Sequence, residues 1–411
     1  MILPCRIHRT RKRNRVDSLP LALMLVTCLF APVREAVSQD AVSAASEGAG
    51  LGWLPAVPLQ ITAGADMGYD DNVNTSPNGE SSVFARENIV LTYARPGQRT
   101  QVGLIGVGRF EQFFDLGTDD KNGNVTLSIT HHSSTRLSFY ASVYAAYETE
   151  PDFKSDVGPE NVRAPHFDTI DIFAVTYYWL PRLSTVTSYT FQLVKYGSAS
   201  IAAEQDRMDN TFGETVQFSL TSRTNLVGDY RYQITDYDTA PNDSTTHYLL
   251  VGIDHHLTEH LIVHARGGPS LRSLKNDGDS TTPYFEGSLE YIRSNHSLNW
   301  TTSYGYEAPT EANASIRKTF RTGLVLTYNL TSRLSSTTSV YFHHDENQDS
   351  ASSGTGSAGS QDSLDLVLGF GYTINKHFAM HLDYSHTTLS SLGATPGYSR
   401  NSYSAGLTYT Y

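Results

Sequence analysis

Charged side chains two positions apart are the residues of this sequence whose spacing most directly suggests chemistry. Arg231 follows Asp229, and Asp383 follows His381, in segments rich in Gly, Ser, Thr and Tyr. Residues at i and i+2 of an extended strand point to the same face, so each pair shares one face. Rows of such charges line water-filled channels and select among solutes. Counted from the apolar face of each segment, the charged residues expected on the second face are Arg109, Glu111, Asp229, Arg231, Arg266, Arg272, Glu286, Glu290, Arg321, Asp365, His381 and Asp383.

Catalytic and metal-binding chemistry has less support. The histidine pairs, such as His343 with His344, are adjacent in sequence, so their side chains point to opposite faces of a strand and do not chelate one ion. The sequence contains neither a G-x-S-x-G nucleophile elbow nor an H-E-x-x-H zinc motif. We therefore expect no enzyme activity, no metal and no cofactor. An enzyme built from Ser, His and Asp at the rim of the fold remains an alternative.

The segments that carry these charges alternate between apolar and polar side chains from Leu59 onward. One face of a late segment holds Leu364, Leu366, Leu368, Phe370 and Tyr372, and one face of another holds Leu298, Trp300, Thr302, Tyr304 and Tyr306. The opposite face is small or polar in both, which predicts a transmembrane β-barrel whose side chains face lipid and lumen in turn. A soluble sandwich has large aliphatics on its inner face instead. A β-propeller is the main soluble alternative.

The breaks between segments are alternately short and long. The short breaks lie at Arg95–Gln98, His132–Thr135, Leu180–Arg182, Thr221–Arg223, Thr258–His260, Ser294–His296, Leu330–Arg333 and Asn375–Lys376. The longer breaks include Asp70–Ala85, Thr149–His166, Asp236–Thr245 and Glu346–Gln361. Outer-membrane barrels have short periplasmic turns and longer extracellular loops. The pattern predicts an all-β, antiparallel transmembrane barrel of about 18 strands, or about 16 if the weakly patterned first hairpin is absent.

Aromatic residues near the segment ends predict the girdles that such barrels place at the two membrane interfaces. The residues concerned are Tyr147, Tyr178, Trp179, Tyr328, Tyr372 and Tyr411. Tyr409 and Tyr411 also stand at the third-last and last positions, which resembles the terminal signal that the barrel assembly machinery recognises. We expect the last strand to pair with the first, because an unpaired edge is not stable in hydrocarbon.

The first residues predict export. Six Lys/Arg residues between Arg6 and Arg15 precede the apolar run from Leu19 to Ala31, and small residues follow at Ala36 and Ser38. This pattern indicates a cleaved signal peptide over residues 1–38, followed by a short periplasmic segment at 39–58 and a barrel at 59–411. Both cysteines lie within the signal peptide. Cleavage removes seven basic and two acidic residues, so the formal charge moves from -12 to about -17, which argues against nucleic acid as a partner.

The segment Gly68-Tyr69-Asp70-Asp71-Asn72-Val73 follows the first predicted strand. It resembles a motif of a family of outer-membrane β-barrel porins, the porin 2 type, whose members often look tied to exopolysaccharide or capsule operons. The resemblance implies a Gram-negative outer-membrane location and the same fold as the alternation does. It assigns no functional residue to this sequence.

These observations predict a porin-like channel for passive diffusion of small hydrophilic solutes, because a barrel of about 18 strands encloses an aqueous interior. Assistance in export of an exopolysaccharide or capsule is the alternative that the resemblance adds. The expected partners are outer-membrane lipid, the assembly machinery, and small solutes or polysaccharide. The third long loop, Thr149–His166, is a candidate for narrowing the channel, and Asp152, Asp156 and Glu160 would then favour cations. A loop that stays on the surface is the other possibility.

Overall fold

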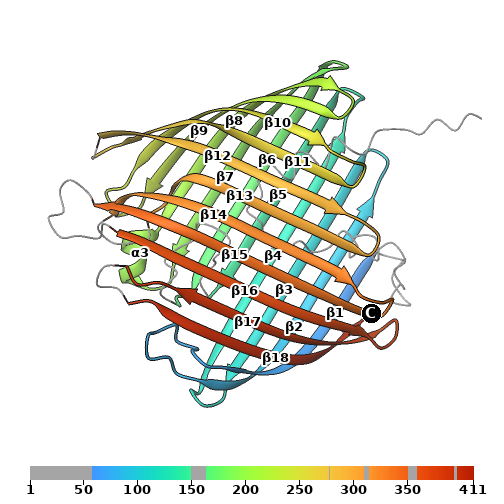
Figure 1. Ribbon diagram of the computed structural model, residues 1–411, viewed down its shortest axis with the longest axis vertical. Coiled ribbons are helices and arrows are strands. Elements are labelled where there is room, and N and C mark those ends of the chain that lie inside the picture. The colour runs from blue at the N-terminus through green and yellow to red at the C-terminus, as the bar shows by residue number, and fades with distance from the viewer. Residues whose placement is uncertain (1–57, 150–162, 277, 310–313, 350–358, 393–395) are drawn as a thin grey trace, which may run out of the picture. The chain divides into compact units, whose positions relative to one another are not determined.

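The computed structural model describes residues 58–149, 163–276, 278–309, 314–349, 359–392 and 396–411. Most of these residues form long antiparallel strands, which Figure 1 draws as tilted arrows. The first strand begins at Leu59. The expected signal peptide and almost all of the expected periplasmic segment lie outside the described residues.

The elements follow one another in chain order with a single described helix. They are β1 (Leu59–Asp70), β2 (Ser82–Pro96), β3 (Thr100–Phe113), β4 (Thr118–His132), β5 (Leu137–Glu148), β6 (His166–Leu180), β7 (Leu183–Tyr196), α3 (Ala199–Gln205), β8 (Arg207–Thr221), β9 (Thr224–Tyr237), β10 (Ser244–His256), β11 (Leu261–Leu274), β12 (Gly278–Ile292), β13 (His296–Glu307), β14 (Ala314–Asn329), β15 (Leu334–Asp349), β16 (Gly359–Thr373), β17 (Phe378–Leu389) and β18 (Tyr398–Thr410).

Each strand pairs with its neighbours in sequence, and β1 also pairs with β18. The closing register runs from Thr62↔Thr410 to Asp70↔Ser402. This last pairing removes the two edges that an open sheet would expose to lipid. The protein is therefore a closed antiparallel barrel of 18 strands, which confirms the predicted fold and selects 18 strands over 16.

The predicted short breaks form tight turns at one end of the barrel, which we call the short-turn end. In these turns a hydroxyl side chain accepts a backbone N–H that has no strand partner. Ser134 Oγ accepts the N–H of Arg136 at 3.1 Å, and Thr331 Oγ1 accepts the N–H of Arg333 at 3.2 Å. This bonding explains why a Ser or Thr recurs at the first position of these turns.

The opposite end, which we call the long-loop end, carries the remaining connections. The connection between β7 and β8 contains α3, which Figure 1 shows as a short coil beyond the strands. Among the residues that the structure describes, we find no helix with the length and apolar character needed to cross a bilayer.

The outward-pointing side chains form an apolar surface. Val251, Met67 and Leu382 are 74%, 64% and 57% exposed. Exposed apolar side chains on this scale mark a surface that contacts something other than water, and on a closed barrel that surface is the lipid face. The barrel therefore spans a membrane with its strands.

The expected aromatic girdle residues lie mostly on this outer face. Tyr147, Trp179 and Tyr372 are 49%, 56% and 43% exposed near the ends of their strands. Tyr178 differs, because it pairs with Ser184, whose buried side chain belongs to the inner face. Its place in a lipid-facing girdle was thus wrongly predicted.

The wall departs from regular alternation between β12 and β13. Pairing of the two strands stops at Tyr304, although β13 continues to Glu307. Tyr306, expected beside Trp300 on the lipid face, is only 7% exposed and donates its hydroxyl to Ser280 Oγ at 2.7 Å. The strand itself continues, because β13 still pairs with β14 as far as Glu307. The expectation fails because the end of pairing with β12 lets the Tyr306 ring reach Ser280 and the guanidinium of Arg272.

Candidate functional site

The inner wall of the barrel carries the charged residues. On β9, Leu226 and Tyr230 are 44% and 41% exposed to the outside, whereas Asp229 and Arg231 point inward and are buried. The same alternation applies to the other strands. It places on the inner face all the charged residues expected there, namely Arg109, Glu111, Asp229, Arg231, Arg266, Arg272, Glu286, Glu290, Arg321, Asp365, His381 and Asp383.

The first group, the seam cluster, lies beside the β1–β18 junction and consists of Asp66, Arg86, Asn88, Glu111 and His381. The Asp66 carboxylate is 2.6 Å from His381 Nε2 and accepts a hydrogen bond from Asn88 Nδ2 at 2.8 Å. Arg86 Nε lies 3.7 Å from Asp66 and 3.9 Å from Glu111. Pairing of this kind offsets the cost of removing the charges from water.

Two predicted residues flank the seam cluster and are more exposed. Arg109 donates from Nε to Asn88 Oδ1 at 3.3 Å and is otherwise open to the interior. The Asp383 side chain is 42% exposed, and its carboxylate lies 3.8 Å from His381 Nε2. Charges of both signs therefore face the interior on this part of the wall.

The second group, the β9–β12 cluster, consists of Asp229, Arg231, Arg266, Tyr284 and Glu286. Arg231 binds Glu286 with two hydrogen bonds, of 3.0 and 2.6 Å, and also contacts Asp229 at 2.7 Å. Arg266 Nη1 lies 3.4 Å from Asp229. Tyr284 donates its hydroxyl to Glu286 at 2.6 Å. The positive charges of the two arginines equal the negative charges of the two carboxylates. The bidentate bond between Arg231 and Glu286 holds the side chains in place.

The third group, the β13–β15 cluster, consists of Glu307, Arg317, Arg321, His343 and Asp345. Arg321 binds Glu307 with two bonds, of 2.6 and 2.7 Å. Arg317, which is fully buried, contacts Glu307 at 3.2 Å and Asp345 at 3.1 Å. Sequence reasoning identified only Arg321 here. The i, i+2 spacing of His343 with Asp345 was the signal that would have found two of the others.

The remaining predicted residues are scattered along the wall. Asp365 accepts a hydrogen bond from Thr387 Oγ1 at 2.7 Å. Glu290 pairs with Asn299 in the strand register and is half-buried. Arg272 lies two residues from the end of β11 and is 5% exposed. The predicted residues thus divide among separate groups on the wall.

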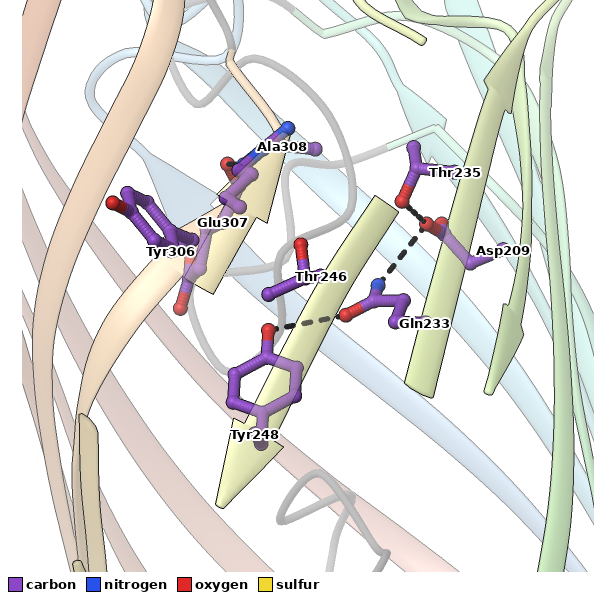
Figure 2. A pocket seen from close by; sticks show the side chains of 9 residues that line it. Asp209, Gln233, Thr235, Thr246, Tyr248, Tyr306, Glu307 and Ala308 are labelled. Carbon is purple, nitrogen blue, oxygen red and sulfur yellow. Dashed lines mark hydrogen bonds between the residues drawn. The ribbon is translucent and has the colours of Figure 1, made fainter. Parts of the chain in front are cut away.

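A polar cavity lies near the long-loop end, against the inner wall of β8–β13 (Figure 2). Its volume is about 30 Å³. On one side, Asp209 accepts a hydrogen bond from Gln233 at 3.2 Å, and Tyr248 donates to Gln233 at 3.1 Å. Arg272 and Tyr306 contribute to the lining as well.

The inner wall differs in exposure around the barrel. Inward-facing residues of β6–β11, such as Asp168, Thr215 and Ser270, are 0% exposed. Inward-facing residues of β2, β4, β5 and β17, such as Asn88, Asn124, Ser142 and His381, are half-buried in the described structure. Exposure of the inner wall is therefore greater at these positions of β2, β4, β5 and β17 than at the buried positions of β6–β11.

The first long loop folds back into the barrel at the long-loop end. Val73 packs against Phe84 and Phe113 in a buried apolar cluster. Arg163, from the third long loop, donates to the Val73 carbonyl at 2.6 Å, pairs with Asp120 and covers the Phe113 ring. Burial, with a smaller contribution from the charge of Arg400, lowers the pKa of Arg163 to about 10, so this guanidinium stays charged at neutral pH.

The candidate constriction residues of the third loop, Asp152, Asp156 and Glu160, lie outside the described residues. The described end of that loop is nevertheless attached to the inside of the barrel mouth through Arg163. The structure thus fixes where the loop returns to the wall.

The motif at the end of β1 closes the barrel seam. Asp70 is 1% exposed and binds Arg400 at 2.7 Å, while Asp71 accepts two hydrogen bonds from Asn401, of 2.6 and 2.7 Å. Asn72 donates to the carbonyls of Ser76 and Ser399. We call these contacts the seam clasp. They give Asp70, Asp71 and Asn72 structural roles in joining β1 to β18.

The described residues contain no group of three or more His, Cys, Asp or Glu side chains arranged to hold a metal ion. The inner wall instead offers paired charges, hydroxyls and amides. Such a wall can exchange hydrogen bonds with polar solutes and with water.

Comparisons with known proteins leave the family open, because the sequence matches no protein-family model and no curated protein. Among solved structures, the chain is similar to the outer membrane protein OpdK from Pseudomonas aeruginosa, with 12% identity, a TM-score of 0.41, and 86% of this chain and 98% of that chain covered. It is also similar to the siderophore receptor PirA from Acinetobacter baumannii, with 7% identity, a TM-score of 0.40, and coverage of 85% and 80%. At such values these similarities carry no argument about function.

Proposed function

We propose that this protein is a porin-like channel of the outer membrane through which small hydrophilic solutes diffuse passively. The observation that carries the proposal is the contrast between the two faces of the closed barrel. The outer face is apolar and the inner face bears paired charges and hydroxyl groups. A barrel of 18 strands is wide enough for an aqueous interior, unlike one of eight strands.

The orientation follows from the lengths of the connections. Short turns face the periplasm and longer loops face outward in barrels of this kind. The short-turn end, which also holds the last residue of β18, is then periplasmic. Export through a signal peptide at residues 1–38, with cleavage before Gln39, and delivery to the assembly machinery would bring the chain to that membrane.

The path for solute runs beside the seam cluster, where the wall is half-exposed. Arg109 and Asp383 offer one positive and one negative charge there. Because most charges elsewhere on the wall are paired with opposite charges, their fields largely cancel beyond a few ångströms. We expect weak ion selectivity from the wall alone, so a constriction would have to supply any strong preference.

The third loop is the candidate constriction. The attachment of Arg163 to Val73 and Asp120 supports a loop that returns through the mouth of the barrel. Asp152, Asp156 and Glu160 would then make the narrow point negative and cation-selective. The alternative is that these three residues remain at the surface and the wall charges set the selectivity.

Assistance in polysaccharide export stays a prediction from the resemblance alone. The motif that carries the resemblance forms the seam clasp, and none of its contacts points to a polysaccharide. A deletion strain that loses surface polysaccharide would favour this second function.

Planar bilayer recordings with the purified full chain test the channel directly. Stable unitary conductance in KCl is expected, and it should be absent from a sample unfolded by boiling. A preparation that is folded by heat-modifiable gel mobility, inserts into the bilayer and passes no current would contradict the proposal.

A further inference from the structure

Arg272 is an exception among the arginines buried in the barrel. Five arginines of the described residues are buried, and four of them contact a carboxylate of the wall. These contacts are Arg207 with Asp209, Arg231 with Glu286, Arg266 with Asp229, and Arg317 with Asp345. A buried cation without such a partner is costly, because it has given up water without gaining a counter-charge.

Arg272 contacts a backbone carbonyl and an aromatic ring, and neither of them carries a negative charge. Its Nη1 donates to the Glu307 carbonyl at 3.3 Å, and its guanidinium lies 5.5 Å from the centre of the Tyr306 ring. Its Nε has no hydrogen-bond acceptor, although the residue is 5% exposed. No carboxylate of the described residues forms an ion pair with it.

Arg272 borders the polar cavity of about 30 Å³. Two acids also border this cavity, but each is bound by another arginine: Asp209 by Arg207 at 3.2 Å, and Glu307 by Arg321 at 2.6 Å. Arg272 is therefore the unbalanced charge at the cavity, and the local field favours an anion.

We propose that this cavity is a subsite for the carboxylate group of a small organic acid, with Arg272 as its counter-charge. The assignment rests on the proposed function, because the solute must enter the lumen to reach the cavity. The guanidinium fork matches the two oxygens of a carboxylate. Nearby hydroxyl groups, such as that of Thr246, can bind polar substituents on the rest of the solute.

The size of the cavity favours a carboxylate over a phosphate. About 30 Å³ admits roughly two water-sized groups, which corresponds to the two oxygens of one carboxylate. The four oxygens of a phosphate need more space. The position near the long-loop end places the subsite where an incoming solute arrives early in its passage.

Equilibrium dialysis of the detergent-solubilised full chain tests the subsite with three matched probes. Glucuronate carries a carboxylate, glucuronamide replaces it with a neutral amide, and glucose lacks both. We expect wild type to bind glucuronate at least about tenfold more tightly than the two neutral probes, since a charge-assisted bond is lost in each. Arg272→Gln should weaken glucuronate binding by a similar factor, and Arg272→Lys should restore part of it.

Arg293→Gln, in an exposed short turn at the opposite end, is the matched control and should bind glucuronate as wild type does. Equal affinity of wild type for glucuronate and glucuronamide would overturn the proposal without requiring any variant. Inorganic phosphate that binds more tightly than glucuronate would overturn it too. If the protein conducts KCl but binds all three probes equally, the channel proposal stands and the subsite proposal is wrong. If it binds glucuronate preferentially but passes no current, the subsite proposal stands and the channel proposal is wrong.

Discussion

Asp70 and Arg400 lie 330 positions apart in sequence and form the ion pair of the seam clasp. Asp70 Oδ1 also accepts the backbone N–H of Asn72 at 2.9 Å, so the carboxylate holds both the neighbouring strand and its own loop. Removal of one member of such a pair takes away a contact that offsets the cost of burying the other.

Replacement of Asp70 by Asn tests this role. The amide keeps the shape of the side chain but removes its charge, so we expect the free energy of unfolding to fall by about 3 kcal/mol. Urea unfolding followed by gel mobility measures the change. Lys121→Gln, which breaks a pair whose side chains are 72% and 44% exposed, should leave the midpoint unchanged. Equal effects of the two variants would show that the clasp does not stabilise the seam.

A second ion pair connects two long-loop connections outside the membrane. Burial raises the pKa of Asp243, but the backbone N–H of Tyr237 and the ammonium of Lys275 outweigh it, so the pKa is lowered overall. A lowered pKa means that the stabilisation is present above the ordinary Asp range and is lost as pH falls through the depressed value.

The pH dependence of Asp243→Asn follows from that sign. We expect a slightly lower urea midpoint than wild type at pH 7, because the pair is largely exposed. The difference should shrink below about pH 4 and vanish once the wild-type carboxyl is protonated. A difference that persists unchanged at low pH would assign the effect to packing of the side chain instead.

Period-two alternation was sufficient to place the charged residues on the inner face, but not to pair them. The bond from Arg231 to Glu286 spans 55 positions, and no spacing within one strand reveals it. For the same reason, the sequence could not show that Arg272 lacks a carboxylate partner among the described residues. Which side chains can pair with it depends on the register of the neighbouring strands.

At the scale of elements, the junction of β1 and β18 depends on the last residues. Tyr411 exchanges two backbone hydrogen bonds with Ile61, of 3.2 and 2.9 Å. Tyr409 pairs with Ala63 and packs its ring against Phe378, with the ring centres 5.1 Å apart. These contacts begin the closing register at the short-turn end.

Deletion of Tyr409–Tyr411 should therefore block assembly and not merely alter conduction. Without these residues β1 keeps an unpaired edge in lipid, which costs several kcal/mol for each unsatisfied group. Heat-modifiable mobility of outer-membrane fractions measures the folded fraction, which we expect to fall strongly. Tyr411→Phe keeps the ring and the backbone bonds and should assemble normally. Normal folded levels of the truncated chain would refute the prediction.

Strand number was predictable because turn chemistry and alternation agree at nearly every connection. The Ser-x-Arg and Thr-x-Arg turns can be predicted from sequence because their hydrogen bonds are local to the turn. The early end of pairing between β12 and β13 was not predictable, because it depends on contacts such as that between Tyr306 and Ser280 across two strands.

At the scale of the whole molecule, a measurement of ion selectivity shows whether the wall charges or the acidic residues of the third loop set the preference. If the third loop narrows the lumen, Asp152→Asn, Asp156→Asn and Glu160→Gln together remove three negative charges from the narrow point. We expect the cation preference, measured as reversal potential in a KCl gradient, to fall in the triple variant. High salt should weaken the wild-type preference, because screening shortens the range of the charges. An unchanged reversal potential would return selectivity to wall residues such as Arg109 and Asp383.

The seam clasp also sets an order of events during biogenesis. Asn72 reaches the Ser399 carbonyl, and Val73, one residue later, packs on Phe84 and Phe113 inside the mouth. Asp70, Asp71 and Asn72 find their partners only after the last strand has arrived beside the first. The entrance therefore acquires its final shape last, and an unfinished barrel held by its assembly factors has a mouth that differs from that of the finished one. An antibody or phage that recognises the folded first loop would accordingly bind only barrels in which β1 and β18 have already paired.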